Sequence, residues 1–129
     1  MSSSQSVDPY LTLRRVERQH SLVETLSAMR GRHASGHDLA TRLGVTTRTI
    51  ERDIERLRIS GVPVAVQRGP GGGYSLPATT ATPITFEPAE VAALVVSLAA
   101  LGPSATDSAQ TAMNKLLAAF TPTTGGSRS

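Results

Sequence analysis

The sequence predicts a mainly α-helical protein with one small β-hairpin, in which three helices and the hairpin are followed by two more helices. Two observations predict this class. Apolar residues recur at helical spacing in five windows, whereas strict apolar–polar alternation is confined to one short stretch after Gly61. Directly after that stretch, glycine fills four of the eight positions of QRGPGGGY, residues 67–74, which is a composition typical of a turn.

The first helix is predicted over residues 13–29, after a polar segment at residues 1–10 that we expect to be a disordered tail. Between its charged positions, apolar residues return every three or four residues and therefore share one face of a helix. The residues of this face are Leu22, Val23, Leu26 and Met29.

The second and third helices are predicted from their capping residues. Ser35, with Asp38 three residues later, is a variant of the capping box and opens a short helix that Gly44 ends. Thr46 is the predicted N-cap of the third helix, which runs to about residue 60 and stops at Gly61. The positions expected to be buried are Leu39, Ala40, Leu43, Ile50, Ile54 and Leu57.

The hairpin is predicted from the alternation in VPVAVQR, residues 62–68, where Val62, Val64 and Val66 would share one buried face. GPGGG then reverses the chain, and YSL returns as a second strand. A nucleotide-binding glycine loop would instead lead into a helix, or carry Gly-Lys-Ser/Thr, and neither occurs here. The glycines are therefore predicted to form the tip of a hairpin.

The C-terminal part is predicted to be a linker at residues 77–87, an apolar helical hairpin at 88–120 and a flexible tail at 121–129. Its helices, 88–101 and 104–120, are too apolar to stay exposed and too few to bury each other. They could pack on the preceding domain or form a four-helix bundle across a two-fold axis, and we favour the dimer. The expected dimer contacts are Val91, Leu94, Val95, Leu98, Leu116 and Phe120.

Composition limits the possible functions. No cysteine is present, which removes disulfides and thiolate metal sites and fits a cytoplasmic protein. The N-terminus has no signal-peptide pattern, and no apolar run is long enough to span a membrane. His33 and His37 are expected to be surface residues and not metal ligands. No motif groups a catalytic set of side chains, so we predict neither enzymatic activity nor a cofactor.

Basic charge is concentrated in residues 1–76, which hold 11 Lys+Arg against 7 Asp+Glu, and all 11 are arginines. Two helices joined by so short a turn, followed by a hairpin, form a winged helix-turn-helix at residues 11–76. On the third helix, Arg48, Arg52 and Arg56 form a positive row, which favours an anionic partner such as DNA. Ion pairs at i, i+3 spacing, such as Arg48–Glu51, Arg52–Glu55 and Glu55–Arg58, leave open an ordinary solvated face.

The stretch GHDLATRLGVTTRTIERDIERLRISGVPVAVQRGPGGGYSL, residues 36–76, resembles the winged helix-turn-helix of bacterial DeoR-like transcriptional regulators, in the branch that carries a WYL domain. The resemblance extends loosely over residues 13–120 and implies a DNA-binding repressor or activator. It implies base contacts from Thr47, Arg48, Glu51 and Arg52, with Arg56 further along the same row. Phosphate contacts are implied for Thr46, His37 and Arg42, and a minor-groove or phosphate contact for Arg68.

Three points are left open by the sequence. Tyr74 either donates to a phosphate or completes the core. The WYL domain of the family is absent, so the chain is either a short member or a fragment of a longer regulator, and no small-molecule effector is predicted. Gln19 stands where such first helices often have leucine.

Besides a homodimeric regulator of double-stranded DNA, two alternative functions remain. They are a protein-interaction module and the regulatory domain of a larger enzyme, as in biotin ligases.

Overall fold

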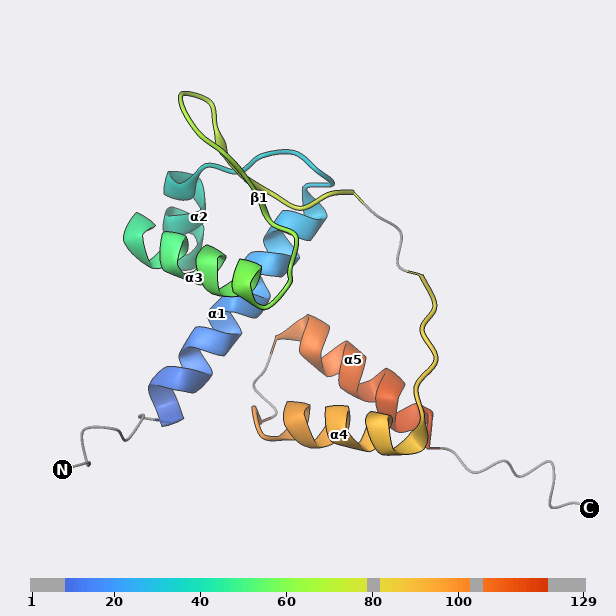
Figure 1. Ribbon diagram of the computed structural model, residues 1–129. Helices are drawn as coiled ribbons and strands as arrows, with labels where there is room; N and C mark the ends of the chain where they lie inside the picture. Colours follow the sequence, from blue (N-terminus) through green and yellow to red (C-terminus); the bar gives the residue numbers. More distant parts are fainter. Residues whose placement is uncertain (1–8, 79–81, 103–105, 121–129) are drawn as a thin grey trace, which may run out of the picture. The chain divides into compact units, whose positions relative to one another are not determined.

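The computed structural model describes residues 9–78, 82–102 and 106–120, and it divides the chain into two compact units, Met1–Ala81 and Thr82–Ser129 (Figure 1). The first unit contains three helices and a two-stranded hairpin, and the second contains two helices. The predicted fold class is confirmed: the protein is mainly helical, with a winged helix-turn-helix followed by a two-helix segment.

The first helix, α1 (Pro9–Ala28), begins four residues earlier than predicted. The expectation that Pro9 and Tyr10 belong to a disordered tail is therefore wrong for those two residues. Proline is well tolerated in a first helical turn, and the guanidinium of Arg14 donates to the Tyr10 hydroxyl (3.0 Å) one turn below it. Residues 1–8 of the predicted tail lie outside the described residues.

The helix-turn-helix consists of α2 (Gly36–Leu43) and α3 (Thr47–Ile59), joined by three residues. The Ser35 hydroxyl accepts from the amide of Asp38 (3.0 Å), and Gly44 ends α2 with a left-handed φ of 71°. The Thr46 hydroxyl accepts from the amide of Thr49 (3.2 Å) at the start of α3. These caps confirm the predicted boundaries and fix the short turn.

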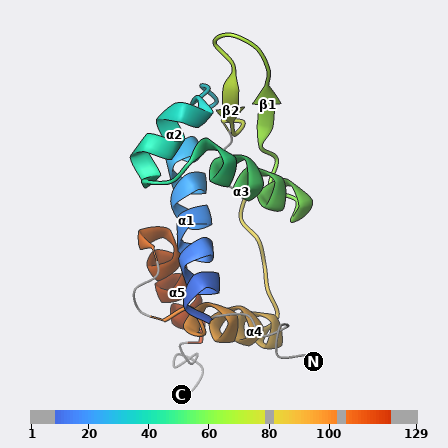
Figure 2. The same ribbon diagram turned by 90° about the vertical axis from the view of Figure 1, so that its left-hand side faces the viewer.

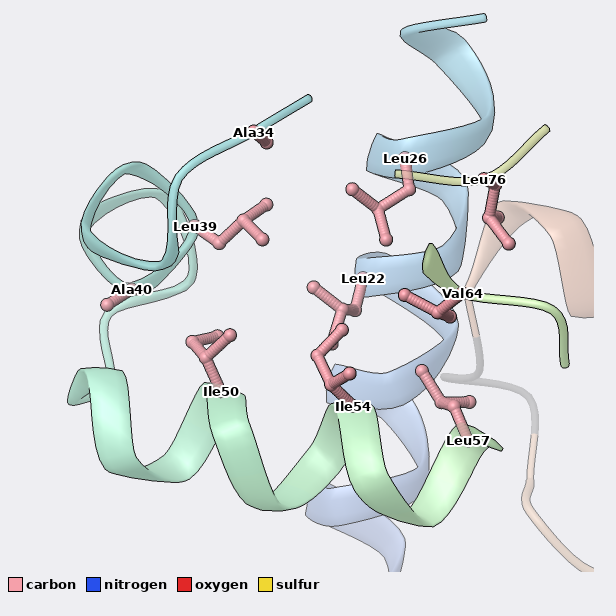
Figure 3. Close-up of a cluster of buried hydrophobic side chains, with 10 residues drawn as sticks. All are labelled: Leu22, Leu26, Ala34, Leu39, Ala40, Ile50, Ile54, Leu57, Val64 and Leu76. Atoms are coloured by element: carbon pink, nitrogen blue, oxygen red, sulfur yellow. The ribbon is translucent and has the colours of Figure 1, made fainter. Parts of the chain in front are cut away.

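The core of the first unit lies where α1 crosses α3, and Figure 3 shows Ile50, Ile54 and Leu57 directed from α3 toward Leu22 of α1. These positions follow the predicted i, i+4, i+7 spacing, so the buried face of α3 is confirmed. The buried apolar residues of this cluster are Leu22, Leu26, Ala34, Leu39, Ala40, Ile50, Ile54, Leu57, Val64 and Leu76.

The hairpin consists of β1 (Ala65–Gln67) and β2 (Gly73–Ser75), paired antiparallel with Val66 opposite Tyr74. It projects beyond the helices (Figure 2), so Val64 at its base is buried whereas Val66 is 39% exposed. The prediction that Val66 belongs to the buried face is therefore wrong. The other edge of β2 exchanges two backbone hydrogen bonds with Ala34 (2.8 and 2.9 Å), an anchor that the sequence did not indicate.

The second unit is a helical hairpin of α4 (Pro88–Ala99) and α5 (Asp107–Ala118), which pack against each other. The Glu90 carboxylate accepts from the Glu87 amide (2.8 Å) and closes the start of α4, while Thr106 caps α5. The sequence predicts a start at residue 104 for this second helix, and residues 103–105 lie outside the described residues. No helix in the described part of the chain is long and apolar enough to cross a membrane.

In the single chain α4 leaves much of its apolar surface exposed, as expected for two helices that are too few to bury each other. Val91 is buried, but Leu94 and Val96 are 38% and 68% exposed. One neighbouring helix can cover only one side of an all-round apolar helix, so the rest of its surface faces outward. The predicted linker, where described, contains neither helix nor strand, and the predicted tail at 121–129 is outside the described residues.

Candidate nucleic-acid interface

The outward face of α3 carries the side chains that the sequence assigned to base contacts. Because Ile50, Ile54 and Leu57 point into the core, the opposite face of α3 faces solvent. The predicted contact residues on this face are all exposed: Thr47, Arg48, Glu51, Arg52 and Arg56. The structure thus brings them together on one helix, beside the hairpin.

Two arginines of this face are not neutralised by a carboxylate. Of the three ion pairs expected along α3, the structure forms Arg58–Glu55, at 4.0 Å. Within the described part of the chain, neither Arg48 nor Arg52 forms an ion pair. Ion pairs between neighbouring side chains therefore account for the charges at the C-terminal end of α3 but not for those around Arg48.

A buried carboxylate on α3, which the sequence patterns did not reveal, changes the position of Arg56. Asp53 is 0% exposed and receives two hydrogen bonds from the Arg18 guanidinium, one of them from Nη2 at 3.2 Å. Gln19 Nε2 (3.3 Å) and Arg56 Nη1 (3.5 Å) complete its surroundings. The guanidinium of Arg56 is thus directed toward Asp53, at the side of α3 nearest α1, although the sequence places it in the row facing DNA.

Asp53 also explains Gln19, which stands where the resemblance implies leucine. An amide can donate to a carboxylate, whereas a leucine side chain would leave one acceptor position of the buried Asp53 without that donor. The spacing could have indicated that Asp53 is buried, because it lies one residue before Ile54 and three after Ile50, at the edge of the buried face. Apolar periodicity alone does not reveal it, because the residue is acidic.

The glycines of the hairpin are required by its backbone conformation and close packing. Gly69 and Gly71 have φ values of 89° and 75°, which side-chain-bearing residues rarely adopt. A Cβ on Gly72 would lie 2.1 Å from the Gln67 carbonyl oxygen, and one on Gly73 only 2.2 Å from that of Ala34. The loop leads into a strand and not a helix, so it forms the tip of a wing.

Tyr74 of β2 packs the hairpin against the core of the first unit. Its ring is half-buried and packs on the core cluster, with Cε2 3.5 Å from where a Cβ on Gly36 would lie. Burial raises the pKa of its hydroxyl above the ordinary value, the nearby Glu51 carboxylate raises it further, and Arg68 lowers it. The packing of Tyr74 against the core cluster supports the core role that the sequence left open.

The remaining predicted contacts are dispersed over the surface. His37 and Arg42 are exposed on α2, and Arg68 is exposed directly after β1, where the loop at the tip of the hairpin begins. The hydroxyl of Thr46 already caps α3, and it also forms a hydrogen bond with the Thr49 hydroxyl (3.1 Å). Among the described residues, no group of three or more His, Cys, Asp or Glu side chains is placed to hold a metal ion.

The expected dimer residues divide into three groups by their exposure. Val91 is only 6% exposed in the single chain, whereas Leu94 and Phe120 are 38% and 45% exposed. Half-buried positions lie between these extremes: Val95, Leu98 and Leu116. Val91 thus has the least surface left for a partner, and the exposed Val96 and Leu117 offer apolar surface that was not assigned to contacts.

Comparison with known proteins identifies the class of domain. Residues 18–75, from within α1 to the end of β2, match the family described as "HTH domain". No solved structure matches the chain. Together with the fold, the match supports a DNA-binding regulator built on a winged helix-turn-helix.

Proposed function

We propose that this protein is a sequence-specific transcriptional regulator that binds double-stranded DNA through α3 and the wing. The observation that carries the proposal is the exposed pair Arg48 and Arg52, which no carboxylate of the described residues neutralises, on a helix that the rest of the domain holds outward. Its mechanism is occupancy of a site, without a catalytic step. The position of that site relative to a promoter then decides between repression and activation.

In this proposal α3 enters the major groove with its N-terminal half. Arg48 and Arg52 pair with the O6 and N7 atoms of guanine, and Glu51 accepts from the N4 amino group of cytosine. The amides of the first turn face phosphate oxygens, as at other helix N-termini. Thr47 lies beside the bases, while Thr46, His37 and Arg42 contact the backbone and fix the register.

The wing contributes a second point of contact. Arg68 is exposed at the far end of β1, where the tip loop begins, and the loop beyond it carries no bulky side chain. Its guanidinium is therefore placed for a phosphate or a narrow minor groove.

The second unit is proposed to form a homodimer. Apolar side chains such as Leu94, Val96 and Phe120 are exposed in the single chain, and a second copy would cover them. A two-fold dimer would place two recognition helices on half-sites about one helical turn apart, or a multiple of it. We propose the bacterial DeoR-like group with WYL-type relatives as the subtype, and the bacterial cytoplasm as the location.

The test is selection from a pool of genomic DNA fragments with the full chain, over a series of salt concentrations. An enriched palindromic sequence, bound less tightly as salt rises, supports a dimeric regulator. Arg48→Gln should abolish the enrichment, while Arg30→Gln, the same change just beyond the C-terminal end of α1, should leave it intact. Equal retention of all fragments by the wild-type chain would contradict sequence-specific binding.

The exposed apolar surface of α4 favours one other candidate, a protein-interaction module on a winged-helix scaffold. The two candidates respond differently to substitution. Arg48→Gln removes DNA binding but leaves a partner bound through α4 unaffected. Leu94→Glu should weaken binding of a partner protein through α4, because it introduces a charge into the apolar surface.

A further inference from the structure

A hollow lined by arginines lies between the N-terminal half of α1 and α3, and the proposed mechanism uses none of its α1 residues. Its cavity volume is ≈ 270 Å³. Three of its arginines come from α1 and two from α3, the helices that cross in Figures 1 and 2. The residues that line it are Leu11, Arg14, Arg15, Arg18, Thr49, Arg52 and Arg56.

Positive charge in the hollow exceeds the negative charge that faces it. The buried carboxylate of Asp53 accepts from Arg18 and Arg56, and it is a single charge between two arginines. Arg14 stacks on the ring of Tyr10 (5.7 Å). Neither Arg14 nor Arg15 forms an ion pair within the described residues. So many like charges around one hollow repel one another unless an anion lies among them.

The position of the hollow relates it to the recognition helix. Thr49, Arg52 and Arg56 follow one another at i, i+3, i+7 and so occupy one side of α3, the side toward α1. Glu51 lies two positions after Thr49, about 200° further round the helix, and therefore on another side of α3. Its charge is one of those that raise the pKa of Tyr74 in β2. Arg52 belongs to both the outward face and the rim of the hollow, so the two basic surfaces are continuous.

A helix inserted in the major groove has a phosphodiester backbone on each side, because the groove is only about 12 Å wide. The wing is placed to meet one of these backbones. The hollow faces the other side of α3, and its guanidinium groups match phosphate oxygens in geometry as well as charge. Residues 1–76 contain no lysine, so every permanently charged basic side chain there is an arginine with a planar guanidinium.

We infer that the hollow between α1 and α3 is a phosphate-binding site for the DNA backbone on the side of α3 opposite the wing, with Arg14 and Arg15 as its principal contacts. This inference rests on the proposed function and adds α1 to the DNA interface. The contacts carry no base information. They add affinity for any sequence and strengthen the dependence on salt.

The test is a titration of the full-length double variant Arg14→Gln/Arg15→Gln with a duplex carrying the enriched site and with a scrambled duplex. Affinity should fall by the same factor, at least several-fold, on both duplexes. The slope of log K against log salt should become shallower by about 0.9 for each phosphate that the variant no longer neutralises. Arg30→Gln/Arg32→Gln removes an equal charge outside the hollow and should leave affinity and slope close to wild type.

The outcomes separate this inference from the proposed function. Wild-type affinity and slope in the double variant, while Arg48→Gln still abolishes the preference for the site, would overturn the inference alone. A loss confined to the selected duplex would also overturn it, because phosphate contacts act on every sequence. Failure of the wild-type chain to bind either duplex would overturn both. Far-UV circular dichroism of each variant shows that the helices remain folded.

Discussion

The substitution Arg18→Met tests whether the buried carboxylate of Asp53 holds α1 against α3. Arg18 donates two hydrogen bonds to Asp53, which is 0% exposed, and the change removes both while keeping an unbranched apolar stem. Breaking a buried ion pair from one side costs about 3–5 kcal/mol, because the remaining charge is left without its counter-charge. A large effect on stability is therefore expected from a single partly exposed arginine.

Two features of the site lower the expected cost. The Arg18 side chain is 23% exposed, so water can reach the carboxylate once the guanidinium is gone. Gln19 (3.3 Å) and Arg56 (3.5 Å) remain as donors to the same oxygen. We therefore expect Arg18→Met to lower the free energy of unfolding by about 2–3 kcal/mol, which is just below the usual range for buried pairs.

The assay is urea unfolding of the full chain followed by far-UV circular dichroism, with Arg58→Met as the matched control. Arg58 lies 4.0 Å from Glu55, and the two side chains are 49% and 64% exposed, so its loss should cost less than about 0.5 kcal/mol. Equal unfolding midpoints for the two variants would refute the claim that the Asp53 site stabilises the domain. Arg18→Met/Asp53→Leu should recover most of the loss, since no buried charge remains.

Three further predictions concern the wing, Tyr74 and the second unit. Gly73→Ala should loosen the hairpin and reduce DNA affinity, because the added Cβ would lie 2.2 Å from the Ala34 carbonyl oxygen. Hydrogen exchange at the Ala34 amide measures the loosening. Unchanged protection of that amide would contradict the prediction. The raised pKa of Tyr74 means that its contribution to stability is complete below the ordinary value of 10.0 and is lost as pH rises through the higher folded value. Alkaline unfolding should therefore be weaker in Tyr74→Phe than in the wild-type chain, and equal curves would refute it. Leu94→Glu should convert a dimer to monomer in sedimentation analysis without loss of helix content, and an unchanged sedimentation coefficient would argue against α4 as the interface.

Local signals in the sequence were sufficient for most of the first unit. The caps Ser35 and Thr46, with Gly44 between them, set the ends of α2 and α3 through hydrogen bonds and a φ value that involve only neighbouring residues. The spacing of Ile50, Ile54 and Leu57 set which face of α3 is buried and, by exclusion, which face carries Arg48 and Arg52. Each of these features depends on residues that are close along the chain, so it can be read from a short window.

Other features depended on residues far apart in the sequence. Val66 is exposed because the hairpin extends past the helices, and Gly73 is required because Ala34 approaches β2. Asp53 is tolerated in the core only because α1 brings Arg18 and Gln19 to it, and the same crossing assembles the arginine hollow. The sequence by itself determined the helices, the turn and the outward face of α3. Only the tertiary structure decided which charges are buried, paired or gathered, because burial and electrostatic energies depend on distances in space.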